Sequence, residues 1–176
     1  MSVTELWPVV DTALKIGIGS SLTLASIYVM HRYKSASDLQ TPRNRRLEMY
    51  EQISAAVGNV NHAFAKYSAL VIESTRFGKN WPVARKTELD RVNAELVMEF
   101  KKLADAEARL LMLGEKTMEK TLRLYGARIA VFRKQVYVGR QDISDQEIAN
   151  LKADIMALRE KFYDLLSKRY DRLLAA

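Results

Sequence analysis

The sequence predicts an all-α protein with one N-terminal transmembrane helix and an antiparallel bundle of about four long helices with coiled-coil-like packing. Helix-forming residues dominate the 176 positions, whereas Gly and Pro number only seven and three. Apolar residues recur every three or four positions over most of the chain, and one long uncharged stretch lies near its start. The predicted organisation is a transmembrane anchor at 1–34, a linker at 35–41 and a cytoplasmic helical bundle at 42–176.

The uncharged stretch covers the fifteen residues from Ile16 to Met30. As a helix it would be about 22 Å long, against roughly 30 Å of membrane hydrocarbon. Extension back to Trp7 gives a spanning length, because Asp11 and Lys15 can pair on one helix face. Basic residues follow the stretch, which puts its C-terminal side in the cytoplasm. The residues expected to set this topology and to meet lipid headgroups are Arg32, Lys34, Arg43, Arg45 and Arg46.

Two other interpretations of this stretch stay open. A cleaved signal peptide would need a basic start, whereas Glu5 and Asp11 lie there. A core helix of a soluble five-helix bundle is the second interpretation, since Thr and Ser residues dilute the stretch. Small residues recur at every fourth position within it, namely Ala13, Gly17, Ser21 and Ala25. This spacing predicts a homo-oligomer held by its membrane helices, although such small residues are also common in membrane helices generally.

The first three bundle helices are predicted from apolar stripes and from the residues that interrupt them. A helix is expected at about 42–77, because Pro at its first position is a start signal. A turn rich in Gly and Pro follows at 78–82. The next stripe covers 89–113, where Gly114 predicts a break or a kink, and a third stripe begins at 118 and ends near Gly139.

The last helix has the clearest start signal in the chain. Ser144 and Glu147 have the spacing of a capping box, and Ile143 and Ile148 stand where a hydrophobic staple would lie. The stripe that follows alternates steps of three and four, which is the coiled-coil period. Short turns between long helices favour an up-and-down bundle.

The order of these parts resembles that of a loose group of small, mostly uncharacterised bacterial membrane proteins. Two short segments carry the resemblance: Arg45-Arg46-Leu47-Glu48-Met49-Tyr50 and Ala108-Arg109-Leu110-Leu111-Met112-Leu113-Gly114. The resemblance covers most of the chain in architecture, and its motifs are short. It implies a bacterial inner-membrane protein with a periplasmic N-terminus and a cytoplasmic bundle, and it brings no activity, cofactor or catalytic residue.

The residues that usually carry enzyme chemistry do not form a recognisable motif. Cys is absent, which removes disulfides, thiolate metal sites and cysteine nucleophiles. The chain has two His residues, of which His62 is expected to be a hydrogen-bonded histidine of the bundle. Gly-rich phosphate loops, serine nucleophile motifs and the Glu-x-x-His repeats of di-iron bundles are also missing. The sequence therefore predicts a protein that is not an enzyme, without cofactor or metal.

Two segments are candidates for binding surfaces. A basic turn carries a Trp, and its candidate partner-binding residues are Arg76, Phe77, Lys79, Trp81 and Arg85. The structural alternative is that Trp81 covers the end of the bundle core. The third helix has basic residues and no acid over 121–140, and its candidate surface consists of Arg123, Arg128, Arg133, Lys134 and Arg140. This surface suits nucleic acid or acidic lipid, or its charges pair with acids of neighbouring helices.

The predicted function is that of a membrane-anchored helical scaffold or interaction protein. It would contact membrane lipid, form a homo-oligomer and recruit an unknown cytoplasmic protein to the inner membrane. One alternative is a toxin or defence effector that perturbs the membrane by oligomerising through its small-residue helix. The other alternative is a nucleic-acid-binding module that uses the basic helix at 121–140.

Overall fold

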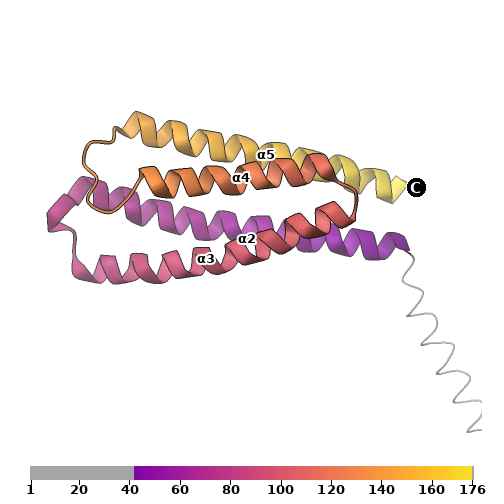
Figure 1. The fold of residues 1–176 in the computed structure, drawn as a ribbon, viewed down its shortest axis with the longest axis horizontal. Coiled ribbons are helices and arrows are strands. Elements are labelled where there is room, and N and C mark those ends of the chain that lie inside the picture. The colour runs from indigo at the N-terminus through magenta and orange to yellow at the C-terminus, as the bar shows by residue number, and fades with distance from the viewer. Residues whose placement is uncertain (1–41, 176) are drawn as a thin grey trace, which may run out of the picture. The chain divides into compact units, whose positions relative to one another are not determined.

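The computed structural model describes residues 42–175, which form four α-helices and one short 3-10 helix without any strand. The elements are α2 (Pro42–Phe77), η1 (Gly78–Asn80), α3 (Val83–Met112), α4 (Lys116–Gln135) and α5 (Asp145–Ala175). Successive helices point in opposite directions (Figure 1). The predicted all-α bundle of long antiparallel helices is therefore confirmed over this part of the chain.

The predicted transmembrane segment, its small-residue positions, Arg32 and Lys34 lie outside the described residues. Among the helices from Pro42 to Ala175, none combines the length and the apolar character that a membrane span needs.

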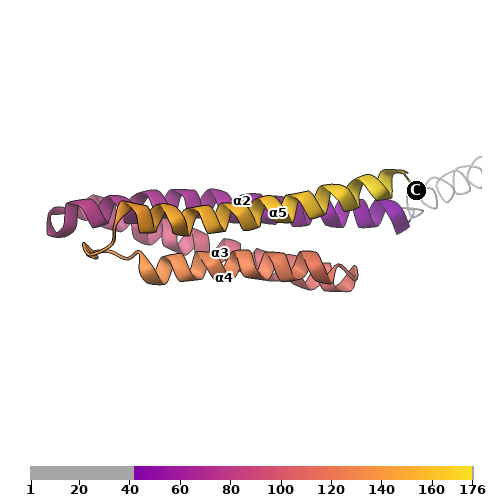
Figure 2. The same ribbon diagram turned by 90° about the horizontal axis from the view of Figure 1, so that it is seen from above.

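The four helices form two layers, α2 with α5 and α3 with α4 (Figures 1 and 2). α4 packs against α5 of the other layer and against α3 of its own layer. The Tyr163 hydroxyl of α5 donates to the Ser54 carbonyl of α2 at 3.3 Å, and Lys66 of α2 pairs with Glu95 of α3 at 3.0 Å. We call the end where α2 begins and α5 ends the base, and the opposite end, with η1, the far end.

The turn between α3 and α4 ends α3 with a regular C-terminal capping motif. The Glu115 N–H donates to the Leu110 carbonyl at 2.8 Å, and the Gly114 N–H donates to the Leu111 carbonyl at 3.0 Å. These two bonds define a Schellman motif, which needs a left-handed residue after the helix. Gly114 has φ +79°, a conformation that side chains with a Cβ rarely adopt. Of the two alternatives predicted at Gly114, the structure has the break.

The predicted capping box of α5 is also present. The Glu147 N–H donates to the Ser144 hydroxyl at 3.2 Å, and the Ser144 N–H donates to the Glu147 carboxylate at 2.9 Å. Hydrogen bonds from Ser144 lower the pKa of Glu147. Ile143 is half-buried and Ile148 is buried, as a hydrophobic staple requires. Each end of this box satisfies an N–H that the first helical turn would leave unpaired.

The apolar stripes of all four helices meet in one core that extends from Tyr50 near the base to Trp81 at the far end. Phe132 of α4 is fully buried and packs edge-on against Phe64 of α2, with ring centroids 5.0 Å apart. One boundary was predicted wrongly, because α4 ends at Gln135 rather than near Gly139. Val136 is fully buried in an extended conformation, so its side chain continues the core after the helix has ended.

Replacing Phe132 with Ala removes a fully buried ring of α4 that packs against Phe64 of α2. We expect the free energy of unfolding to fall by about 3–5 kcal/mol, since a buried aromatic ring is lost and a cavity remains. The measurement is urea unfolding followed by circular dichroism. Met156→Ala is the control, because Met156 is 39% exposed and its loss should change the stability by less than about 0.5 kcal/mol. Equal losses in both variants would contradict this assignment of the core.

Candidate interaction surfaces

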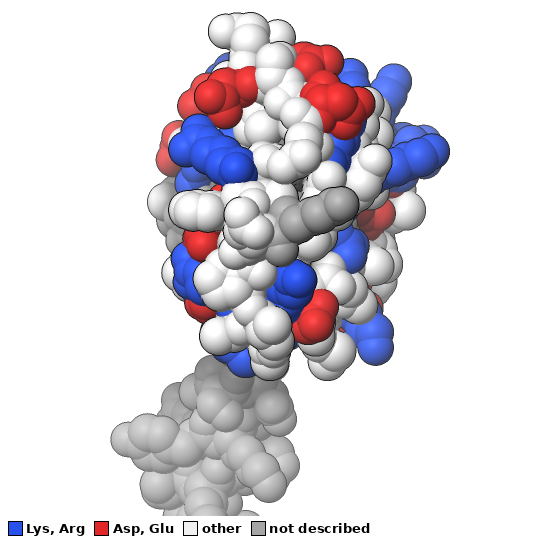
Figure 3. Space-filling model, turned by 90° about the vertical axis from the view of Figure 1, so that its left-hand side faces the viewer, with Lys and Arg blue, Asp and Glu red and all other residues white. Residues whose placement is uncertain are grey.

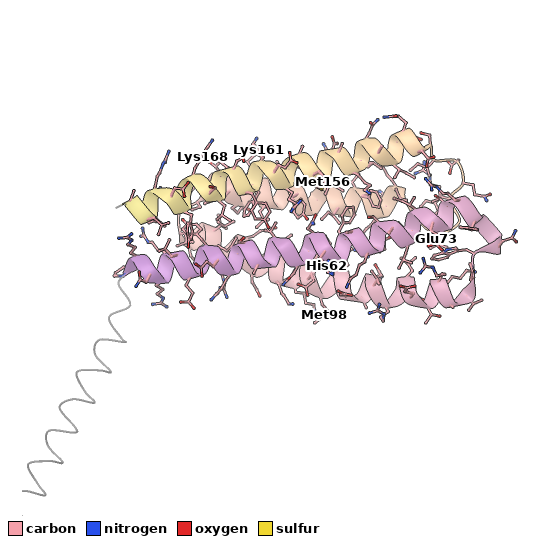
Figure 4. All side chains as sticks on the ribbon, turned by 180° about the vertical axis from the view of Figure 1, so that it is seen from behind. His62, Glu73, Met98, Met156, Lys161 and Lys168 are labelled. Atoms are coloured by element: carbon pink, nitrogen blue, oxygen red, sulfur yellow. The ribbon has the colours of Figure 1, made fainter. Side chains whose placement is uncertain are left out.

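The Trp of the basic turn lies in the core at the far end. Trp81 is 2% exposed, and its indole N–H donates to the Glu73 carboxylate at 3.1 Å. The Arg85 guanidinium donates to the same carboxylate through Nε at 3.0 Å and also pairs with Glu88 at 2.6 Å. Figure 4 shows Glu73 near the far end, between α2 and α3. This cluster fixes the start of α3 against the end of α2.

Glu73 is held as a carboxylate by these donors. Hydrogen bonds from Arg85 and then from Trp81 lower its pKa. Glu73 in turn raises the pKa of Arg85, with a smaller contribution from Glu88. Two of the five residues predicted to bind a partner, Trp81 and Arg85, therefore meet at one carboxylate that holds two helices together.

The other residues of that prediction are more exposed. Arg76 pairs with Asp145 of α5 at 3.2 Å in a solvent-exposed contact, and Phe77 is 57% exposed. The side chain of Lys79 lies outside the described residues. Val83 is 76% exposed and adds a second apolar side chain, which the sequence interpretation missed because it lies before the apolar stripe of α3. In Figure 3, uncharged side chains gather in the middle of this end, with acidic and basic groups around them.

The five basic residues predicted on the third helix do not form a uniform surface. Arg133 donates to the Asn93 amide oxygen at 2.6 Å, and its guanidinium lies 5.5 Å from the centroid of the Tyr67 ring. Arg140 pairs with Asp142 at 3.0 Å, and Arg123 pairs with Glu119 at 3.5 Å.

Arg128 and Lys134 are exposed and form no ion pair with a described carboxylate. The structure thus brings Arg133 onto α2 and α3, and three of the five side chains, Arg128, Arg133 and Lys134, have no carboxylate partner among the described residues. Binding of nucleic acid or acidic lipid by this helix stays a prediction.

A second polar cluster lies near the base and was not predicted. The Tyr50 hydroxyl of α2 donates to the Glu115 carboxylate at 3.0 Å. Arg169 of α5 donates to the same carboxylate. Burial is the main cause that raises the pKa of Tyr50, so its hydroxyl stays protonated and able to donate. Periodicity could not reveal this cluster, because its three members come from α2, the α3–α4 turn and α5.

Two open surface grooves flank α2 where its side chains are small. The groove against α5 is lined by Tyr50, Glu51, Ser54, Ala55, Tyr163, Leu166, Ser167 and Tyr170. The groove against α3 is lined by Gln52, Ile53, Ala55, Ala56, Asn59, Lys102, Asp105, Ala106 and Arg109. In the groove against α5, the Tyr170 hydroxyl donates to the Glu51 carboxylate at 3.0 Å.

The remaining chemical groups also stay apart within residues 42–175. No group of three or more His, Asp or Glu residues there could hold a metal ion. His62 lies exposed on α2 (Figure 4) and makes no hydrogen bond with a described residue, so its predicted role as a bonded bundle histidine was wrong. Tyr125 is fully buried without a hydrogen-bond partner, and desolvation raises its pKa. A buried neutral phenol of this kind is a poor nucleophile.

Comparison of the chain with known protein families, with curated proteins and with solved structures gave no match.

The Glu73 cluster predicts a pH dependence of stability. The folded state lowers the pKa of Glu73, so its contribution is present above the unfolded value of about 4.3 and is lost as the pH falls through the folded pKa. We expect Glu73→Gln to lose stability at neutral pH and to show a shallower decline of the unfolding free energy below about pH 4.3. Denaturant unfolding at a series of pH values measures both effects.

The matched control is Glu160→Gln, which changes an exposed carboxylate on α5 that has no ion pair with a described residue. This control should keep the pH dependence of the unmodified protein. An unchanged pH dependence in Glu73→Gln would contradict the assigned role of the cluster.

Proposed function

We propose that this protein is a non-enzymatic, membrane-anchored scaffold. Its N-terminal segment holds it at a bacterial inner membrane, and the far end of its bundle binds a cytoplasmic protein. The observation that carries the proposal is the exposure of Phe77 and Val83 at the end opposite to the one where α2 begins. A partner-binding surface at that end lies as far from the anchor as the bundle allows.

The length of the bundle supports a spacer role. The 36 residues of α2 correspond to about 54 Å of helix at 1.5 Å per residue. Carboxylates tie neighbouring elements together at both ends, through Glu73 at the far end and through Glu115 at the base. A bundle fixed at both ends transmits the position of its anchor to its far end.

The far end has the residue types that dominate protein interfaces. Phe77 offers an aromatic ring, and Arg76 carries an exposed guanidinium beside it. Aromatic and Arg side chains are enriched among the few interface residues that supply most of the binding energy. Burial of Phe77 and Val83 by a partner would add hydrophobic free energy on the order of 1.5–3 kcal/mol for each side chain.

Oligomerisation of the anchor belongs to the same proposal. The four-residue spacing of Ala13, Gly17, Ser21 and Ala25 would let two membrane helices approach closely. An oligomer would present several far ends side by side. Several weak contacts to a multivalent partner would then act together and raise the overall affinity.

Fractionation of cells tests the anchor. The full-length protein should stay in the membrane after carbonate extraction, and a chain that starts at Ser35 should appear in the soluble fraction. Mass measurement of the detergent-extracted protein gives the number of copies, and Gly17→Leu should reduce that number if the small residues join the helices. Release of the full-length chain by carbonate would contradict membrane anchoring.

Site-specific cross-linking in cells tests the far end. A photo-reactive amino acid placed at Phe77 or at Val83 should attach to the same distinct protein. The control position is Met156, an exposed apolar residue on the side of the bundle. Adducts that are absent at Phe77 and Val83, or equally abundant at Met156, would contradict a partner-binding far end.

A further inference from the structure

The base carries an exposed apolar turn. Leu111 and Met112 form the last two positions of α3 and are 54% and 77% exposed. Gly114 closes the turn, and a Cβ placed on it would meet no atom within 4 Å, so solvent surrounds this corner of the bundle. Leu111 and Met112 therefore lie outside the core, and both side chains are accessible to a membrane or to another apolar surface.

Cations without a carboxylate partner lie on the helices that meet at this end of the bundle. Lys116 and Lys120 follow the turn on α4, and further basic residues stand at the start of α2 and in the last turns of α5, which end at the base (Figure 1). All are exposed and form no ion pair with a described carboxylate; they are Arg45, Arg46, Lys116, Lys120, Lys168 and Arg172. We call these six residues and the two apolar ones the base surface.

Both ends of the bundle carry exposed cations. At the far end, Arg76, Arg85 and Arg140 pair with carboxylates, whereas Lys86 and Lys134 form no ion pair with a described carboxylate. At the base, Arg169 pairs with Glu115, and the six cations of the base surface are exposed to solvent. Glu48 and Asp171 are the exposed acids nearest to them in the chain. The base thus offers positive charge and apolar side chains together.

We propose that the base surface contacts an anionic lipid bilayer, with Leu111 and Met112 in the headgroup region and the surrounding cations on lipid phosphates. Apolar side chains next to Lys and Arg are the combination that binds membrane interfaces. Anionic lipids on the cytoplasmic leaflet attract such cations over about one Debye length. This inference rests on the proposed function, because it names the surface by which the anchored bundle is held against its membrane.

The position of the apolar stretch in the chain favours a bilayer as the occupant. Ile16–Met30 precedes α2 by eleven residues, 31–41, which can span at most about 40 Å when extended. An anchor there keeps the base close to a bilayer, but it does not fix the distance between the bundle and the bilayer or the orientation of the bundle. The contact made by the base surface fixes this distance and this orientation.

Contact between the base surface and the bilayer also sets the tilt of the bundle axis. The start of α2 and the end of α5 extend beyond the α3–α4 turn (Figures 1 and 2). A flat surface that touches both the start of α2 and the turn is therefore inclined to the bundle axis. The bundle leans with its α3–α4 side toward the bilayer, which brings Lys116 and Lys120 to the lipid phosphates.

The absence of Cys allows a direct test on the full-length chain. Met112→Cys and Val83→Cys each carry one environment-sensitive fluorophore, and both proteins are reconstituted in vesicles with or without anionic phospholipid. The two positions form a matched pair, since they lie at opposite ends of α3 and are 77% and 76% exposed. We expect a blue shift and quenching by spin-labelled lipid at position 112 in anionic vesicles, and neither effect at position 83.

A charge-reversal variant tests the contribution of the cations in the base surface. Lys116→Glu with Lys120→Glu, made in the Met112→Cys chain, should weaken the blue shift, and so should high salt. Lys152→Glu with Lys161→Glu on α5 is the control and should leave the signal unchanged.

Flotation of the vesicles separates the two proposals. If the protein floats with the vesicles and position 112 behaves like position 83, the base surface is overturned and the anchor stands. If the protein does not float, the anchor and the base surface both fail. A blue shift of equal size in vesicles without anionic phospholipid would show that the cations do not hold the surface on the bilayer and would also overturn the proposal.

Discussion

The burial of one apolar stripe from each of four helices is the constraint on which the rest of the structure depends. Each stripe covers only one side of its helix, so no helix can satisfy its apolar residues alone. The edge-on contact of Phe64 with Phe132 joins α2 to α4 across the bundle, and Phe162 of α5 is fully buried as well. Once these stripes meet, the helices must be antiparallel neighbours joined by short turns, and charged residues are left on the outside.

The two ends of the core are closed in the same way. At the far end Glu73 accepts from the Trp81 indole and from Arg85, and at the base Glu115 accepts from the Tyr50 hydroxyl and from Arg169. In each case a buried aromatic ring presents its polar edge to a carboxylate that an arginine neutralises. The arrangement lets large rings fill the tapering ends of the core without leaving an unpaired N–H or O–H. These charged residues hold neighbouring helices together at each end.

Local signals in the sequence predicted the four helices of the bundle, but they could not predict the contacts between helices. Pro42, Gly114 and the capping box of Ser144 and Glu147 act within one turn, so their effects could be predicted from neighbouring residues. The end of α4 was misplaced because Val136 stays buried after leaving the helix. The partners of Arg133 and Glu115 come from other helices, and the spacing along one helix cannot say which residue lies opposite. Exposure of the Met112 turn depends in the same way on the packing of the whole bundle.

A stiff bundle with distinct surfaces at its two ends couples those surfaces mechanically. If the base rests on a bilayer at an angle set by the α3–α4 turn, the height of the far end above the lipid equals the bundle length multiplied by the cosine of that tilt. Loss of the contact at Leu111 and Met112 would let the bundle swing on its linker, and the far end would sample many heights. A partner that binds Phe77 and Val83 while it is itself held at the membrane would then pay a larger entropic cost. In the proposed arrangement, the base surface would therefore act on partner binding through geometry alone, with no conformational change inside the bundle.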